Sequence, residues 1–195
     1  MAEYHDAMLW AAGEGGTVQC KLCGKACQVP AGRYGTCRVR LNVDGRFVST
    51  NYDTVVAMHV DPIEKKPLFH FMPGTRSLSI AAPGCNFQCE FCQNWRISQS
   101  PRNDPALVGE AISPEQIVAA ALGHDCASIS YTYTEPTVFF ELAYETARLA
   151  HPAGVRNCFV SNGYMTPQAV DMIAPYLDAI NVDLKAFTNE FYRDM

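Results

Sequence analysis

Residues 78–92 read LSIAAPGCNFQCEFC, and this stretch decides how the rest of the chain is interpreted. An apolar run leads into a Pro-Gly turn and then into Cys85, Cys89 and Cys92, spaced C-x3-C-x2-C. This order places the thiols at the carboxyl end of a strand, where α/β folds bind their ligands. Thiolates are soft ligands that suit iron–sulfur clusters or zinc. Because a closed structural site uses four protein ligands, three thiolates predict a metal site with one open position.

The composition limits the classes of protein that the chain can belong to. It has 195 residues, 48% of them hydrophobic, which is enough for one domain with a small appendage. The net charge is -5 and no basic stripe is present, so we expect no nucleic-acid partner. No apolar run reaches the roughly 18 to 20 residues that cross a bilayer, so we expect no membrane partner. The N-terminus lacks a signal-peptide pattern, and nine cysteines in a chain that is not exported favour metal chemistry in the cytoplasm over disulfides.

A second group of cysteines precedes the first, with the spacing C-x2-C-x3-C-x9-C. Its members are Cys20, Cys23, Cys27 and Cys37. Four thiolates in so short a segment, interrupted by glycines, predict a closed four-ligand site that staples a segment too short to bury its own core. Zinc is the default occupant, a second iron–sulfur cluster is the competing one, and free thiols are the remaining alternative.

The chain divides into three parts by pattern. Residues 1–17 are expected to be a loosely held terminus. Residues 18–76 are expected to form the Cys-rich segment with a small β-sheet, in which residues 39–43 and 46–49 make a hairpin around the type I′ turn Asp44-Gly45. Residues 54–60 are a third β-rich run, assigned to the same small sheet.

Residues 77–195 alternate between strand and helix. Ser113-Pro114 begins one helix, with Gln116 completing a capping box, and Thr166-Pro167 begins another. A third helix follows Glu135-Pro136. Strand–helix alternation at this spacing predicts a parallel sheet with right-handed crossovers. The expected strands cover residues 77–82, 128–133, 157–161 and 179–184.

The cysteine spacing, with an aromatic residue before the third cysteine, resembles that of the radical S-adenosylmethionine (SAM) enzymes. The wider sequence resembles the pyruvate formate-lyase activating-enzyme group, in particular the radical SAM member of the AmmeMemoRadiSam system. This resemblance covers nearly all of the chain after about Val18. It implies a partial (β/α)6 barrel with about four of its six strands, so the chain looks C-terminally truncated. The blocks that carry it are DPIEKKPLFHF (61–71), QNWRIS (93–98), YTYTEPT (131–137), SNGYMTP (161–167) and NVDLKAF (181–187).

The resemblance also implies roles for the residues at the first two strand ends. The thiolates of residues 85, 89 and 92 would hold a [4Fe–4S] cluster whose fourth iron is chelated by SAM. Phe91 would lie against the adenine, or it would simply pack. Glu135 stands where the family has a Gly-Gly-Glu motif that binds the methionine amino group, and Tyr133 and Thr134 replace the two glycines. The alternative for Glu135 is an exposed acid that complements a helix dipole.

The last two strand ends carry the remaining SAM contacts that the resemblance implies. Asn162 would line the SAM pocket. Asp183 and Lys185 face the same side of an extended chain, because side chains alternate along a strand. Lys185 would pair with the SAM carboxylate and Asp183 would contact polar groups nearby, unless the two merely form a salt bridge at the strand end.

These assignments predict a radical SAM enzyme of the activating-enzyme type. A reduced cluster would cleave SAM to a 5′-deoxyadenosyl radical, which takes a hydrogen atom from a substrate, possibly a glycyl residue of a protein. The implied partners are therefore an electron donor such as flavodoxin or ferredoxin and a possible protein substrate. The alternative is an iron–sulfur or zinc module that transfers electrons without cleaving SAM.

Overall fold

The fold is built on a five-stranded sheet with the order β13-β12-β11-β9-β8. The computed structural model describes residues 4–103 and 108–194. Four of the strands run parallel, and β8 runs antiparallel beside β9. All four strands predicted for the core are therefore present. The strands are β8 (Ala57–Pro62), β9 (Arg76–Ala81), β11 (Ser128–Tyr131), β12 (Arg156–Ser161) and β13 (Ala179–Val182).

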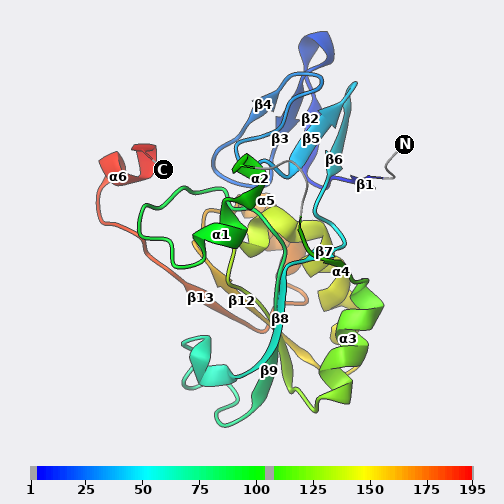
Figure 1. The fold of residues 1–195 in the computed structure, drawn as a ribbon, viewed down its shortest axis with the longest axis vertical. Helices are drawn as coiled ribbons and strands as arrows, with labels where there is room; N and C mark the ends of the chain where they lie inside the picture. The colour runs from blue at the N-terminus through cyan, green and yellow to red at the C-terminus, as the bar shows by residue number, and fades with distance from the viewer. Residues whose placement is uncertain (1–3, 104–107, 195) are drawn as a thin grey trace.

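Helices connect the parallel strands, and α3 and α4 lie side by side against the sheet (Figure 1). The predicted capping box begins α3, because Ser113 accepts from the Gln116 amide while the Gln116 side chain accepts from the Ser113 amide. Thr166 caps α5 in a similar way. The longer helices are α3 (Pro114–Gly123), α4 (Phe140–Ala150) and α5 (Pro167–Ile173), and the short ones are α1 (Trp95–Ser98), α2 (Ser100–Asn103), α6 (Asn189–Asp194), η1 (Glu14–Gly16), η2 (Ile63–Lys65) and η3 (Pro136–Phe139). No helix among these described segments is long and apolar enough to cross a membrane.

The register of the parallel strands brings their carboxyl ends to one edge of the sheet. Tyr131 at the end of β11 pairs with Ile80 on β9 and with Phe159 on β12. Ser161 at the end of β12 pairs with Val182 at the end of β13. The interiors of β9, β11 and β12 are almost completely buried, as expected for a parallel sheet, whereas Ile180 and Val182 on the edge strand β13 are exposed. The loops that follow these strands therefore open at the same edge, which is where the predicted site residues lie.

Short strands from the first part of the chain lie above this sheet in Figure 1. The hairpin of β5 and β6 forms as predicted, and both turn residues have positive φ, 50° at Asp44 and 90° at Gly45, as a type I′ turn requires. The small sheets are β1 (His5–Asp6) with β6 (Arg46–Ser49) and β5 (Arg40–Val43), β2 (Trp10–Ala12) with β3 (Val18–Cys20) and β4 (Gln28–Val29), and β7 (Thr54–Val55) with β10 (Glu110–Ala111).

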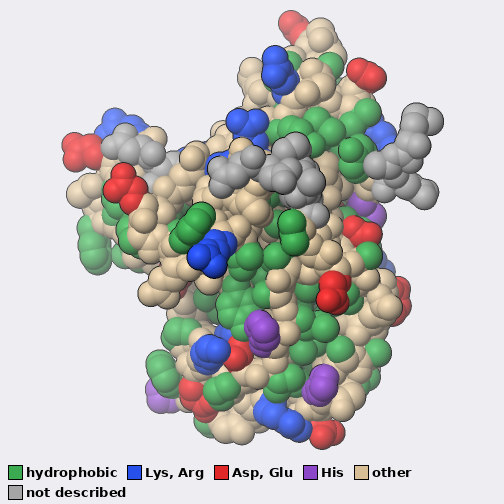
Figure 2. Space-filling model, viewed as in Figure 1, with side chains coloured by type: hydrophobic (Ala, Val, Ile, Leu, Met, Phe, Trp, Pro, Cys, Tyr) green, Lys and Arg blue, Asp and Glu red, His purple; other side chains and the backbone are tan. Residues whose placement is uncertain are grey.

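Two expectations for this region are wrong. Residues 5–17 are not loosely held, because β1 and β2 pair with β6 and β3 while Ala7 is buried and Trp10 packs edge-on against Phe47. The run at residues 54–60 does not stay in one small sheet. It divides into β7 and β8, and β8 joins the main sheet, where it covers an edge of β9 that would otherwise be unpaired. Figure 2 shows apolar side chains over this part of the molecule, where Met58 and Val60 of β8 are exposed.

Candidate functional site

A cavity of about 440 Å3 gathers the site residues that were predicted for the core. They come from the loops after β9, β11, β12 and β13, which the parallel register brings to one edge. The structure therefore places these residues around one space, and their roles as ligands stay predictions. Those residues are Cys85, Cys89, Phe91, Cys92, Glu135, Asn162, Asp183 and Lys185.

Residues 85–92, which we call the Cys loop, follow β9 after a turn that requires glycine. Gly84 has a φ of 111°, and a Cβ atom at this position would lie 2.9 Å from the Cγ1 atom of Val39. A larger residue would be strained in both conformation and space. The turn thus directs Cys85 into the cavity while its other side packs closely against the N-terminal strands.

The thiols lie in a partly buried, weakly polar environment. The Phe87 amide donates to the Cys85 sulfur at 3.4 Å, and the Cys92 sulfur lies 3.4 Å from the Ser98 hydroxyl. Burial, with a smaller contribution from the nearby Glu135 carboxylate, raises the pKa of Cys85 to about 12. A thiol of this kind loses its proton at neutral pH when a metal cation supplies compensating charge.

The arrangement of the thiols can be compared with what a metal centre requires. In residues 4–103 and 108–194, no three Cys, His, Asp or Glu side chains converge closely enough to hold one metal ion. A four-iron cluster is held differently, since its thiolate ligands bind separate irons of a larger body. Three thiols spread around one roomy cavity therefore fit a [4Fe–4S] cluster better than a single ion.

Glu135 is a buried carboxylate that joins the ends of two strands. Its side chain accepts hydrogen bonds from the Thr137 amide and hydroxyl, the Ser161 hydroxyl and the Asn162 amide. Burial raises its pKa, and these four hydrogen bonds only partly oppose the shift. The alternative of an exposed acid at a helix start is wrong, because the residue is 2% exposed, although it does cap η3.

Asn162 is held by a residue that the sequence did not single out. Its Nδ2 donates to the Asn86 Oδ1 at 2.8 Å, and its Oδ1 accepts from the Tyr164 amide at 3.0 Å. Asn86 is completely buried and directly follows the first cysteine of the Cys loop. A polar residue next to a predicted ligand is a signal that could have identified it.

Asp183 and Lys185 face the same side of the chain, as predicted. Their side chains form an ion pair of 2.9 Å, which is the contact that the salt-bridge alternative describes. Burial lowers the pKa of Lys185, but the hydrogen bond and charge of Asp183 outweigh it and the pKa is raised. The Lys185 charge in turn opposes the burial that raises the pKa of Cys89, so this cation lies near the Cys loop.

Phe91 is largely exposed and does not pack into the core. Its ring stacks on that of Phe191 in α6, with the centroids 6.0 Å apart and the planes 22° from parallel. This arrangement leaves part of an aromatic face at the rim of the cavity. Phe91 therefore packs against α6 outside the core, and its contact with the adenine stays a prediction.

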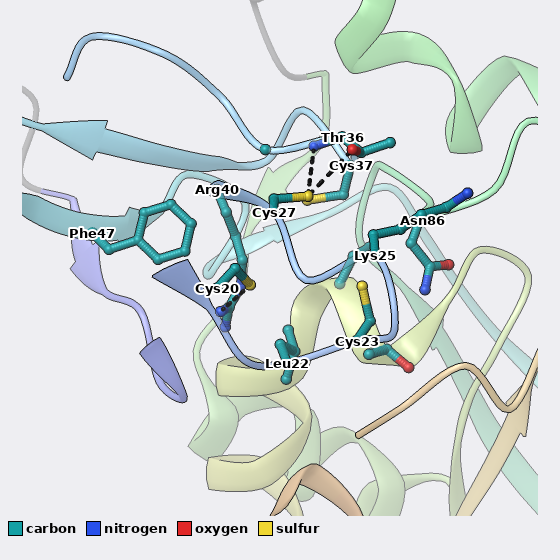
Figure 3. A pocket seen from close by; sticks show the side chains of 13 residues that line it. Cys20, Leu22, Cys23, Lys25, Cys27, Thr36, Cys37, Arg40, Phe47 and Asn86 are labelled. Carbon is teal, nitrogen blue, oxygen red and sulfur yellow. Dashed lines mark hydrogen bonds between the residues drawn. The ribbon is translucent and has the colours of Figure 1, made fainter. Parts of the chain in front are cut away.

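All four cysteines of the N-terminal group line a second, much smaller pocket of about 20 Å3 (Figure 3). The Arg40 guanidinium donates to the Cys20 sulfur at 3.7 Å, and the Thr36 amide donates to the Cys27 sulfur at 3.5 Å. Burial raises the pKa of Cys37 to about 12. The volume is close to that of one water-sized sphere, which is enough for one ion. The thiols match the donor set of a structural zinc site, although their present orientations do not converge on one point.

A mainly parallel sheet whose strand ends surround a cavity lined by thiols, a buried carboxylate and an Asp–Lys pair is the arrangement of an α/β protein that can bind a cofactor. Residues 79–195 match the sequence profile of the Radical SAM superfamily, and the chain belongs to this superfamily. Membership implies a [4Fe–4S] cluster and SAM as cofactors and supports SAM-cleaving radical chemistry.

The chain is also similar to the uncharacterized protein MJ0808 of Methanocaldococcus jannaschii. The two are 39% identical over 188 residues, which is 96% of this chain and 55% of the relative. The chain therefore spans about half the length of that protein.

Proposed function

We propose that this chain binds a [4Fe–4S] cluster through Cys85, Cys89 and Cys92 and uses it to cleave SAM reductively. The observation that carries the proposal is the cavity of about 440 Å3 that these thiols share with Glu135 and Lys185. When bound, the cluster would supply one electron for cleavage of the C5′–S bond of SAM, which would release methionine and provide a 5′-deoxyadenosyl radical for hydrogen abstraction from a substrate.

The side chains around the cavity have distinct tasks in this proposal. The Lys185 ammonium pairs with the carboxylate of the methionine moiety, and Asp183 orients it through their 2.9 Å ion pair. Glu135 receives the methionine amino group, since a carboxylate and an ammonium form a strong hydrogen bond. Phe91 offers its exposed face to the adenine, and Asn162 lines the pocket in an orientation that Asn86 fixes.

We further propose that the chain acts as an activating enzyme, whose substrate is a glycyl residue of a partner protein. Exposed aromatic rings near the Cys loop and α6 support a protein partner, because such rings are enriched at protein interfaces. These rings belong to Trp95 and Phe187. An electron donor such as flavodoxin or ferredoxin would reduce the cluster in the cytoplasm, and the sheet would be part of a (β/α)6 barrel.

An electron-transfer module that does not cleave SAM is the competing function. The Asp183–Lys185 pair and the buried Glu135 argue against it, because an electron carrier has no need of groups that bind an amino acid. The two functions differ in their response to SAM, which gives the test.

The first test is anaerobic electron paramagnetic resonance of the reconstituted and reduced protein, with and without SAM. We expect a [4Fe–4S]⁺ signal that changes shape on addition of SAM, because an iron without a protein ligand can bind it, together with formation of 5′-deoxyadenosine. A cluster signal that is indifferent to SAM, with no 5′-deoxyadenosine formed, would favour the electron-transfer module.

We also propose that the N-terminal cysteines bind one structural zinc ion, since the pocket of about 20 Å3 suits a single ion. Replacing Cys23 with alanine should lower the zinc content by one ion per chain and leave the iron content unchanged. Both metals can be measured by plasma emission on the same sample. Loss of iron in place of zinc would assign a second iron–sulfur cluster to this group. The control is Cys126→Ala, because Cys126 lines neither pocket.

A further inference from the structure

A second group of charged side chains lines the same cavity and has no part in the proposed function. Lys65, Lys66 and Tyr133 contribute to the cavity wall, and Asp61 lies behind them at the end of β8. Lys65 is the last residue of η2 and Lys66 directly follows it, whereas Tyr133 lies in the loop after β11. Three of these residues, Asp61, Lys65 and Lys66, belong to the sequence block DPIEKKPLFHF (61–71).

One carboxylate in this group contacts two ammonium groups. The Lys66 Nζ lies 2.7 Å from the Asp61 Oδ2, and the Lys65 Nζ lies 2.8 Å from the Oδ1. The Tyr133 hydroxyl also donates to the Oδ2. Burial alone would raise the pKa of Asp61, but the three hydrogen bonds hold it well below its usual range. Burial and the Asp61 carboxylate raise the pKa of Tyr133 to about 12, so the phenol is neutral and the group carries one excess positive charge.

Lys66 is the unusual member of the group because it is a lysine that is only 2% exposed. An ammonium has three donors, and the structure shows Lys66 using one of them, toward Asp61. Its Nζ also lies 4.6 Å from the centroid of the Tyr133 ring. A buried cation is costly unless anions and acceptors surround it. Asp61 supplies one anionic partner, and an anion from a ligand would supply acceptors for the remaining donors of the Lys66 ammonium.

Tyr133 is held in a conformation that its residue type rarely adopts. Its φ is 63°, in the left-handed region. The Asn94 Nδ2 donates to its carbonyl at 2.8 Å, and Asp61 accepts from its hydroxyl, so the residue is fixed at both ends. Backbone conformations of this kind concentrate at functional sites, where the surrounding structure maintains them.

The two cationic parts of the cavity come from opposite edges of the sheet. Asp61 and Lys66 belong to β8 and the turn after it, and Asp183 and Lys185 follow β13. The Lys185 end is near the Cys loop, and the proposed function assigns it to the carboxylate of SAM. A single SAM carboxylate that pairs with Lys185 has no need of a second lysine, Lys66, at the other edge.

We propose that Lys66, positioned by Asp61 and Tyr133 and assisted by Lys65, binds an oxyanion of the substrate, a carboxylate or a phosphate. The inference rests on the proposed function in that it assigns the Lys185 end to SAM. It places the substrate in the cavity of about 440 Å3, with its anionic group at the β8 edge and its remainder extending toward the Cys loop.

The test uses the reconstituted protein loaded with SAM and calorimetric titration with inorganic phosphate and, separately, with acetate at constant ionic strength. We expect binding of at least one probe, and its identity separates a phosphate from a carboxylate site. Lys66→Met should weaken that binding by about tenfold or more, as expected for one lost hydrogen bond to a charged group. Lys66→Arg should retain most of it. Lys21→Met, at an exposed position in the N-terminal region, is the charge-matched control.

Three outcomes would overturn the inference. These are no binding of either probe, equal binding by wild type and Lys66→Met, or a loss of SAM affinity in Lys66→Met that matches that of Lys185→Met. If Lys66→Met does not fold because Asp61 loses its buried partner, the double variant Asp61→Asn/Lys66→Met removes both charges and should show the same loss. Formation of 5′-deoxyadenosine is measured in parallel, so failure of the proposed function is distinguished from failure of anion binding.

Discussion

Replacement of Cys89 with alanine is expected to remove the iron–sulfur cluster and with it the cleavage of SAM. The cluster would be left with two thiolate ligands, and the open position would no longer be unique. Loss of an outer-shell partner alone costs about 10- to 100-fold in metal affinity or activity, so loss of a ligand should cost more than about 100-fold. Iron and sulfide per chain, together with 5′-deoxyadenosine formation, measure the effect.

Cys89 suits this experiment because it is only partly buried, so its replacement leaves no large cavity in the core. Cys126→Ala is the matched control. Cys126 is buried outside the cavity, so this variant should keep the iron content of the wild type. Full iron content in Cys89→Ala would show that the Cys loop does not hold the cluster.

Replacement of Glu141 with alanine is expected to have the largest effect on stability. Arg40 on β5 and Glu141 on α4 form an ion pair in which the two side chains are 1% and 0% exposed. The same carboxylate accepts from the Met8 amide at 2.7 Å, and Arg40 donates to the Met8 carbonyl at 2.8 Å. Removing one partner leaves a buried guanidinium uncompensated, which costs about 3–5 kcal/mol of the free energy of unfolding. Urea denaturation of both proteins measures the difference.

The double variant Arg40→Met/Glu141→Leu is the control for this prediction. It removes both charges and keeps apolar volume, so it should recover most of the lost stability. A double variant as unstable as Glu141→Ala would mean that the hydrogen bonds to Met8, and not the unpaired charge, dominate. A loss below about 1 kcal/mol in Glu141→Ala would show that the pair behaves like an exposed one.

Local sequence patterns predicted the elements whose formation depends on a few neighbouring residues. The capping box at Ser113 and Gln116 and the turn at Asp44-Gly45 are recognisable because each backbone group finds its partner within four residues. The position of β8 is different. Its apolar run is compatible with either sheet, and the choice is decided by the edge of β9, which only exists once the core sheet has formed.

The same distinction applies to the site. The residues that follow the parallel strands could be predicted to meet, because parallel register brings strand ends to one edge. Asp61 and Lys66 could not be placed in this way, since Asp61 belongs to the strand that runs in the opposite direction and Lys66 lies in the turn after it. They are linked to the loop after β11 by the hydrogen bond from the Tyr133 hydroxyl to Asp61. No local sequence pattern indicates the left-handed backbone conformation of Tyr133.

The antiparallel placement of β8 has a consequence for the order in which the molecule assembles. Residues 63–75 connect β8 to β9, whereas β9 and β11 are separated by residues 82–127. A short connection closes at lower entropic cost, and contacts between residues near in sequence form sooner than distant ones. The β8–β9 ribbon can therefore pair while β11 is still being synthesised. It would present an open edge on which each later strand adds in turn, so that the Cys loop is anchored before the rest of its cavity exists.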